Sequence, residues 1–230
     1  MDGWTTNRAR PGGAEGVSVM GLVLALLLVA DWVALVPTVS KHVPRIEISK
    51  GGETGVCSAV VFEVDKDGYG HALTAAHCVE RASDTERIDI TVNGRNGVTV
   101  ARNNILDLAI LKFRARSETA ITIASTGPLA GAEVAAIGYG FGIEEFAVQF
   151  GHIAQPLNRE TKAMWVDLTA LMGDSGGPIV NAQGELIGIT SRIYAGGMLS
   201  QMAHITAAVP LDSLRDFIDS YQAERAKERK

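Results

Sequence analysis

The chain has 230 residues and a formal net charge of −5, with 21 Lys and Arg against 26 Asp and Glu. Both signs are dispersed and no basic stripe is present, which excludes the charge pattern of a nucleic-acid-binding protein. A chain of this length buries one sizeable core, so we expect one main domain with an N-terminal extension. The 25 glycines favour a fold of many short strands and turns.

Residues 1–16 are a polar N-terminal segment, and residues 17–36 after them are almost entirely apolar. Such a run is long enough to span a bilayer, and it also fits the hydrophobic region of a secretory signal. We therefore expect an N-terminal hydrophobic helix, with a buried core helix as the alternative. Small residues at 38–40 favour cleavage of a signal, whereas Asp31 lies close enough to one end of the run for an uncleaved transmembrane anchor, which we favour. With the N-terminus inside, both interpretations place the remaining chain outside the cytoplasm, either membrane-anchored or secreted.

Residues 37–55 contain two prolines and the pair Gly51-Gly52, and we interpret them as a linker. Residues 56–230 then form the predicted folded domain. Short β-rich runs alternate there with turn residues, a pattern typical of an all-β sandwich or barrel. The predicted strands are 57–64, 71–74, 88–92, 98–102, 108–113, 133–137, 146–152, 164–168, 178–180, 186–192 and 203–209.

The C-terminal end of the chain has a different pattern. After Pro210, apolar residues recur at helical spacing with charges between them: Leu211, Leu214, Phe217, Ile218 and Tyr221. This predicts one amphipathic helix that packs by its apolar stripe and frays into a charged tail from Glu224.

The sequence offers no pattern for a metal or a cofactor. CxxC and HExxH motifs and cysteine–histidine clusters with zinc spacing are missing. Residues 138–142 are glycine-rich, but they lack a lysine and a following helix, so we interpret them as a turn after a strand. The two cysteines, Cys57 and Cys78, allow a single pairing, and the redox compartment decides whether it forms.

Three short stretches together point to nucleophilic catalysis. Residues 173–178 read Gly-Asp-Ser-Gly-Gly-Pro, residues 74–78 read Thr-Ala-Ala-His-Cys, and residues 107–111 read Asp-Leu-Ala-Ile-Leu. They supply a histidine, a carboxylate and a serine, in that order along the chain. A serine hydroxyl becomes a strong nucleophile when an imidazole takes its proton and a carboxylate orients that imidazole.

These stretches, in this order and in a β-rich chain, resemble the chymotrypsin-like (trypsin-fold) serine protease family over about residues 55–220. The resemblance implies two six-stranded antiparallel β-barrels, followed here by the C-terminal helix. The short spacing from His77 to Asp107 is similar to the compact bacterial, HtrA-like members. We expect no PDZ domain, because the chain ends one helix after the predicted barrels.

The resemblance also implies the roles of the residues in the three stretches. His77 is the general base, Asp107 orients it and Ser175 is the nucleophile. The backbone N–H groups of Gly173 and Ser175 are the expected oxyanion-hole donors. Asp174, although it neighbours the nucleophile, is expected to be a structural carboxylate beneath the loop.

The resemblance further implies a disulfide and a specificity pocket. Cys57 and Cys78 match the family's bridge beside the catalytic histidine, although in a reducing compartment both would stay buried thiols. Thr169, Ser191 and Ile193 match the pocket positions. Because Thr169 is no acid and Ile193 is bulky, we expect a shallow pocket for small or medium apolar side chains and no trypsin-like preference.

The predicted function is therefore serine endopeptidase activity through an acyl-enzyme intermediate, acting on protein or peptide substrates. A catalytically silent binding module on the same fold is the main alternative. An esterase or transferase that uses the same triad is another.

Overall fold

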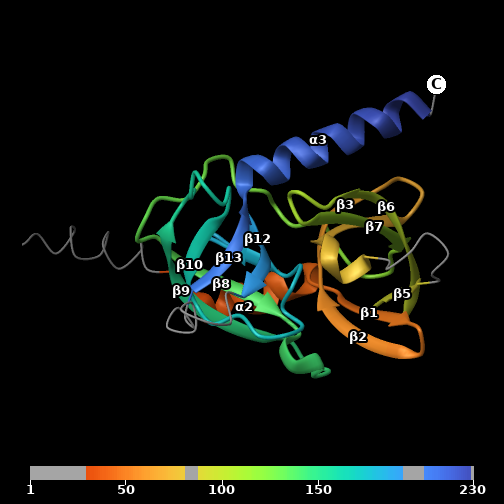
Figure 1. Cartoon of the computed structure of the whole chain (residues 1–230), viewed down its shortest axis with the longest axis horizontal. Coiled ribbons are helices and arrows are strands. Elements are labelled where there is room, and N and C mark those ends of the chain that lie inside the picture. Colours follow the sequence, from red (N-terminus) through yellow and green to blue (C-terminus); the bar gives the residue numbers. More distant parts are fainter. Residues whose placement is uncertain (1–29, 81–87, 194–204, 229–230) are drawn as a thin grey trace, which may run out of the picture. The chain divides into compact units, whose positions relative to one another are not determined.

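A computed structural model describes residues 30–80, 88–193 and 205–228 of the chain (Figure 1). The fold belongs to the compact unit Asp31–Lys230. It consists mainly of β-strands arranged in two sheets, with one helix before them and one after them.

The first sheet contains seven antiparallel strands in the order β2-β1-β5-β6-β7-β4-β3. Buried and more exposed residues alternate in β1 and β5, whereas β4 and β7 are buried along most of their length, and both patterns are readable in the sequence. The strands are β1 (Arg45–Lys50), β2 (Glu53–Ser58), β3 (Val60–Val64), β4 (Tyr69–Ala75), β5 (Ile88–Val92), β6 (Arg95–Asn103) and β7 (Leu108–Arg114).

The predicted linker over residues 37–55 is wrong, because residues 37–42 belong to a helix and a 3₁₀ turn, and β1 and the start of β2 form a hairpin after Pro44. Gly51 and Gly52 make its two-residue turn with positive φ angles of 57° and 89°. Only glycine takes that pair of conformations readily, so the Gly-Gly pair marks a hairpin rather than a flexible connection. Ile46 and Ile48 of β1 are buried in the core of the first sheet.

The prediction of a six-stranded first barrel is also wrong. The predicted strand over 57–64 is divided at Ala59 into β2 and β3, which form the two opposite edges of the seven-stranded sheet. The N–H of Ala59 donates to the Pro44 carbonyl at 3.1 Å instead of to a neighbouring strand. One residue therefore joins the two edges, so the sheet must curl until they lie close together.

The second sheet is a closed six-stranded barrel, in the order β10-β13-β12-β11-β8-β9, and it confirms the predicted second barrel. All of its neighbouring strands run antiparallel. The strands are β8 (Glu133–Gly138), β9 (Ala147–Gln155), β10 (Met164–Asp167), β11 (Pro178–Val180), β12 (Leu186–Ile193) and β13 (Ile205–Pro210).

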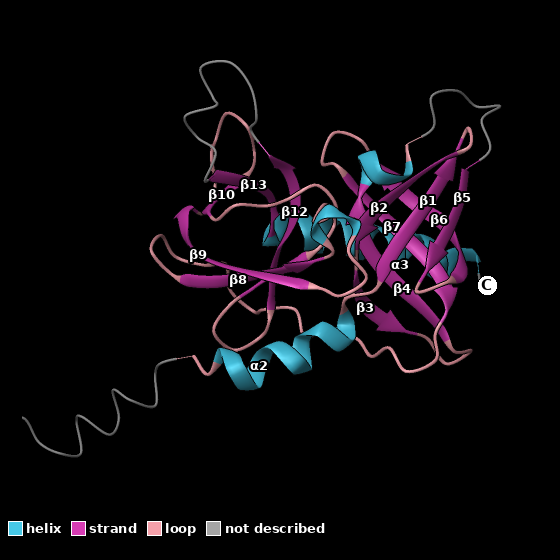
Figure 2. Cartoon of the chain, turned by 90° about the horizontal axis from the view of Figure 1, so that it is seen from below, coloured by secondary structure: helices cyan, strands magenta, loops and turns pink. Residues whose placement is uncertain are grey.

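Helix α2 (Trp32–Val39) precedes the sheets and packs on the second barrel (Figure 2). Asp31 caps it by accepting a hydrogen bond from the Ala34 N–H at 3.1 Å. The Trp32 indole donates to Glu133 at 3.0 Å and packs edge-on against Phe150. Most of the predicted hydrophobic helix, residues 17–29, lies outside the described residues. Within the described ranges, no helix has the length and apolar character needed to cross a membrane.

The predicted C-terminal helix is confirmed as α3 (Leu211–Glu228), which continues four residues past Glu224. Leu211, Leu214, Ile218 and Tyr221 form its buried stripe. It begins directly after β13 of the second barrel and extends over β3 and β7 of the first sheet (Figure 1). Three short 3₁₀ turns complete the described elements: η1 (Ser40–His42), η2 (Ala76–Val79) and η3 (Gly140–Gly142).

Apolar side chains of the two sheets meet in one shared core cluster. Leu73 and Leu108 of the first sheet lie in it together with Ile137 and Ile189 of the second barrel. Leu214 and Tyr221 add the apolar stripe of α3 to the same cluster. The segments that carry His77 and Asp107 belong to the first sheet, and the loop that carries Ser175 belongs to the second barrel. The shared core fixes the positions of these segments relative to one another.

Candidate active site

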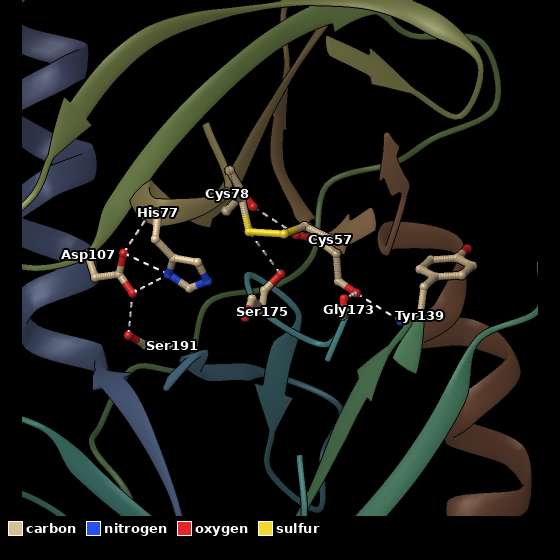
Figure 3. Close-up of a disulfide and its surroundings, with 10 residues drawn as sticks. Cys57, His77, Cys78, Asp107, Tyr139, Gly173, Ser175 and Ser191 are labelled. Atoms are coloured by element: carbon tan, nitrogen blue, oxygen red, sulfur yellow. Dashed lines mark hydrogen bonds and ion pairs between the residues drawn. A yellow bond between two sulfur atoms is a disulfide. The ribbon is translucent and has the colours of Figure 1, made fainter. Parts of the chain in front are cut away.

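The Asp107 carboxylate holds His77 in a fixed orientation (Figure 3). The backbone N–H of His77 donates to Asp107 Oδ1 at 2.9 Å, and its Nδ1 lies 2.9 Å from Oδ2 and 3.1 Å from Oδ1. A carboxylate accepts hydrogen bonds, so the proton of the neutral imidazole is on Nδ1 and the lone pair on Nε2. The Asp107 side chain is buried at 7 % exposure, whereas that of His77 is 43 % exposed.

Local turns place these two side chains together. Asn103 Oδ1 accepts the N–H groups of Ile105 and Leu106, each at 3.0 Å, and so shapes the turn that leads to Asp107. Asp107 itself has a positive φ of 55°, and its carbonyl accepts the Ala76 N–H at 3.1 Å. This last bond joins the start of β7 directly to η2, the turn that carries His77.

Ser191 supports Asp107 from the second barrel. Its hydroxyl donates to Asp107 Oδ2 at 2.5 Å, and the residue is 8 % exposed. Burial acts to raise the pKa of Asp107, but hydrogen bonds from His77 and Ser191 outweigh it and lower the pKa below its ordinary value. Asp107 is therefore an anion at neutral pH. Sequence reasoning placed Ser191 in the specificity pocket and missed this contact with the carboxylate.

Ser175 lies on the side of the imidazole opposite to Asp107 (Figure 3). Among the described residues, no hydrogen bond joins Ser175 to His77; in unliganded sites such bonds are often long. The Ser175 carbonyl accepts the N–H of Ser58 at 2.9 Å, and the next N–H, of Gly176, donates to the Thr190 carbonyl at 2.8 Å. The serine is thus held between β2 of the first sheet and β12 of the second barrel.

Ser58 connects the first sheet to the loop around Ser175, and nothing in the sequence singled it out. Its hydroxyl donates to the Gly173 carbonyl at 2.8 Å and accepts the Tyr139 N–H at 2.9 Å. Its own carbonyl accepts the Thr74 hydroxyl at 2.8 Å. Ser58 is fully buried, so these bonds form away from water. The one sequence feature that could have pointed to Ser58 is its position directly after Cys57.

Gly173 and Ser175 stay the predicted oxyanion donors, and the backbone at position 173 requires a glycine. Gly173 has a φ of 106°, and a Cβ atom there would lie 2.3 Å from the Tyr139 carbonyl oxygen, so only glycine fits. The Met172 carbonyl accepts the Phe141 N–H at 2.5 Å. In a trans peptide the N–H of Gly173 points away from that carbonyl. Neither this N–H nor that of Ser175 forms a hydrogen bond with any residue the structure describes.

Cys57 and Cys78 form a disulfide, as predicted. It joins the end of β2 to η2, one residue after His77. Cys78 Sγ also lies 3.9 Å from the Ser175 carbonyl oxygen. The bridge therefore braces the turn that carries the imidazole and contacts the loop that carries the serine.

The three predicted pocket positions lie on neighbouring backbone segments: Ile193 pairs with Thr206, whose hydroxyl bonds to the Leu168 carbonyl and the Ala170 N–H on either side of Thr169. That they line one pocket stays a prediction. Thr169 is exposed and lines a hollow with Glu133, Phe150 and His152, apart from the triad. Ser191 faces Asp107, as shown above. The backbone of Ile193 pairs with Thr206 in β12, but its side chain lies outside what the structure describes. In the described ranges, no group of three His, Cys, Asp or Glu side chains is placed to hold a metal ion.

An imidazole between a buried carboxylate and a serine, on two packed antiparallel sheets, is the arrangement of a chymotrypsin-like serine peptidase. The family model described as "Trypsin-like peptidase domain" matches residues 54–189, and the chain belongs to this family.

Two curated relatives and one solved structure show how near the similarity is. A probable periplasmic serine endoprotease, DegP-like, from Halomonas elongata is 32% identical over 168 residues, covering 69% of this chain and 34% of the relative. Human serine protease HTRA4 is 28% identical, covering 75% of this chain and 36% of the relative. The chain thus spans about a third of the length of these relatives. The serine endoprotease from Yersinia pestis shares the fold, with a TM-score of 0.68 and 24% identity over 83% of this chain and 66% of that one.

Proposed function

We propose that the protein is a serine endopeptidase that cleaves protein or peptide substrates through His77, Asp107 and Ser175. The observation that carries the proposal is the anchored imidazole. Asp107 fixes Nδ1 as the protonated nitrogen, which leaves the basic Nε2 for the hydroxyl of Ser175. Family membership supports the same reaction.

The reaction follows from this arrangement. Ser175 Oγ attacks the carbonyl carbon of the scissile bond while its proton passes to His77 Nε2. The carbonyl oxygen becomes an oxyanion, which accepts hydrogen bonds from the N–H groups of Gly173 and Ser175. When the intermediate collapses, the C–N bond breaks, and the leaving amine takes the proton from the imidazolium. Water then attacks the acyl-enzyme by the same steps, with His77 again as base, and releases Ser175.

Asp107 does not itself take up the proton. Its role is to hold the correct tautomer and to stabilise the positive charge that forms on His77. The lowered pKa of Asp107 supports this role, because the group stays ionised throughout the pH range in which an imidazole titrates. Ser191 contributes by occupying one carboxylate oxygen and keeping the group oriented.

Small or medium apolar side chains are the proposed residues on the acyl side of the cleaved bond. The support comes from the sequence: neither Thr169 nor Ser191 offers a carboxylate for a basic side chain, and Ile193 is bulky. An arginine or lysine substrate would need such an acid in the pocket.

The proposed location is outside the cytoplasm. The Cys57–Cys78 disulfide supports it, since such bonds persist in oxidising compartments. The name of the Halomonas elongata relative, which calls that protein periplasmic, agrees with this location. The apolar run over residues 17–36 is the proposed anchor or signal only up to Asp31, because residues 32–36 belong to α2, which packs on the second barrel. Sequencing the N-terminus of the mature protein decides between them: a start near residue 41 shows a cleaved signal, and an intact N-terminus shows an anchor.

Digestion of unfolded casein, followed by mass spectrometry of the products, tests the activity. We expect the wild type to cleave mainly after small or medium apolar residues, and Ser175→Ala to cleave at background level. A folded wild type that cleaves no protein would contradict the proposal and favour the silent binding module. Hydrolysis of simple esters without any peptide cleavage would favour an esterase. Cleavage mainly after arginine would overturn the proposed specificity alone.

A further inference from the structure

The loop that carries Ser175 rests on the segment between β8 and β9. Gly138, the last residue of β8, and Gly140, in the turn after it, face the side chain of Asp174: a Cβ atom on them would lie 2.7 and 3.1 Å, respectively, from Asp174 Oδ1. The Asp174 side chain therefore fills the space that the two glycines leave open. Because Asp174 lies between the two proposed oxyanion donors, Gly173 and Ser175, the position of its side chain sets the orientation of both peptide groups.

Asp174 is almost completely buried, with 2 % of its surface exposed. Its Oδ2 accepts the Leu171 N–H at 2.7 Å and the Gln149 Nε2–H at 3.2 Å. In the described part of the chain, no Lys, Arg or His forms a hydrogen bond or an ion pair with it. An isolated buried carboxylate is costly unless it is hydrogen-bonded, so the Leu171 N–H and the amide of Gln149 supply the donors that a cation would otherwise supply. Burial raises the pKa of Asp174, and the bonds from Leu171 and Gln149 oppose that rise.

The contact between Gln149 and Asp174 is partly buried, with Gln149 itself half-buried. Gln149 stands on β9 opposite Ala136 of β8, which fixes its backbone beneath the loop. Its Oε1 and Asp174 Oδ1 are both buried, and neither has a hydrogen-bond partner among the described residues. Ser58 of β2 and Tyr139 after β8 are polar neighbours of this segment, and Arg45 of β1 donates to the Gly142 carbonyl at 3.3 Å. Tyr139 donates its hydroxyl to the Val43 carbonyl, and burial raises its pKa, so it stays neutral.

From this geometry we propose that Gln149 is a positioning residue for the oxyanion hole. It acts through Asp174, whose side chain it holds beneath the loop, and it does not touch the substrate. The inference rests on the proposed peptidase function, because the oxyanion hole is defined by that reaction. Positioning errors of about 1 Å in a catalytic group cost up to about 10²-fold in rate.

Two substitutions of Gln149 test this role. Gln149→Leu keeps a similar volume but removes the donor, so we expect kcat to fall about tenfold to a hundredfold while KM changes less than about threefold. Gln149→Glu places a second carboxyl group against Asp174. Two buried carboxyl groups in contact do not both ionise readily, and the protonated one donates to the other. Lowering the pH therefore restores the hydrogen bond in this variant.

The experiment measures kcat and KM between about pH 6 and 9 on a peptide that contains a cleavage site chosen by the wild type. The expected result is a ratio of Gln149→Glu to wild-type kcat that rises as the pH falls, because the lost bond returns on protonation. The same ratio for Gln149→Leu should not change with pH. Gln155→Leu, on the same strand but bonded to Asn158 instead, is the matched control and should stay within about twofold of the wild type.

Three results would overturn the inference. The first is a Gln149→Leu variant with wild-type kcat, and the second is a Gln149→Glu variant whose pH profile matches that of Gln149→Leu. The third is failure of both variants to fold, judged by circular dichroism, because Gln149 would then be a structural residue. A wild type that cleaves no peptide bond would instead refute the peptidase function, and this inference with it. The activity of the wild type thus distinguishes the two failures.

Discussion

Asp107 is the single residue on which the orientation of the imidazole depends. It accepts hydrogen bonds from the backbone and ring of His77 and from the hydroxyl of Ser191, so both of its oxygens are occupied. An acceptor at this place forces the proton of His77 onto Nδ1. Any replacement that can donate a hydrogen bond there changes the tautomer without changing the shape of the site.

Asp107→Asn should therefore abolish most of the activity while leaving the fold intact. The new amide group donates toward Nδ1, the imidazole proton moves to Nε2, and Ser175 loses its base. We expect kcat to fall about 10⁴-fold at neutral pH. Asp67→Asn, at an exposed turn, is the control and should keep its activity. A loss of less than about tenfold for Asp107→Asn would contradict the assigned role, as measured by steady-state peptide hydrolysis.

At the scale of elements, α3 fastens the second barrel to the first sheet. It begins at the end of β13, yet its Tyr221 hydroxyl lies 2.9 Å from Nδ1 of His71 in β4. One turn later, Arg225 forms an ion pair with Glu63 of β3. His71 is completely buried, and burial lowers its pKa, so it is neutral at pH 7. The sequence showed the apolar stripe of α3 but gave no sign of these polar contacts.

Tyr221→Phe tests this connection between α3 and β4. It removes the hydroxyl and leaves His71 Nδ1 buried without that partner, which costs about 1–3 kcal/mol in the free energy of unfolding. Urea denaturation at pH 7 measures the change. Tyr69→Phe, at an exposed ring that stacks with Lys112, is the control. If Tyr221→Phe is no less stable than this control, α3 does not depend on the bond to His71.

A second contact between elements gives the stability a pH dependence. Burial acts to raise the pKa of Glu118, but hydrogen bonds from Arg95, from the Arg116 N–H and from Asn93 outweigh it and lower the pKa from 4.5 to about 2. A carboxyl group with a lowered pKa stabilises the fold above its unfolded-state pKa, and this contribution is lost as the pH falls toward the folded-state value. The bond network ties β6 to the segment after β7.

Glu118→Gln should therefore be less stable than the wild type at about pH 6–7, and the difference should narrow as the pH falls from about 4.5 toward 2. Unfolding by urea at several pH values measures both free energies. A difference that stays constant over this range, or widens at low pH, would show that the lowered pKa of Glu118 does not support the fold.

At the scale of the whole molecule, the sequence predicts what lies in local patterns and misses what comes from distant segments. The stretches around His77, Asp107 and Ser175 each have their own signature. The strands of the second barrel are either continuous buried runs, as in β8, β11 and β13, or alternate, as in β9 and β10. Ser58 and Gln149 have no motif, because their roles depend on contacts with a loop more than 20 residues away in the sequence. The strand count of the first sheet was predicted wrongly for a related reason, since the division of residues 57–64 at Ala59 depends on the hydrogen bond from Ala59 to the distant Pro44 carbonyl.

The two sheets form one site, because each supplies a part that does not function alone. The first sheet carries His77, Asp107 and the Ser58 hydroxyl, and the second barrel carries Ser191 and the loop with Ser175. The apolar cluster that both sheets and α3 share holds these parts in register. We predict that Ser175 is unusually nucleophilic in the intact fold, although other serines are also accessible.

The most direct test of that claim is covalent labelling of the folded full-length protein with a fluorophosphonate, followed by intact-mass and peptide mass spectrometry. We expect one adduct per chain, located on Ser175, at a rate that falls in His77→Ala. Ser175→Ala should remain unlabelled. A folded wild type without an adduct, or an adduct that persists in Ser175→Ala, would contradict the assignment of Ser175 as the activated nucleophile.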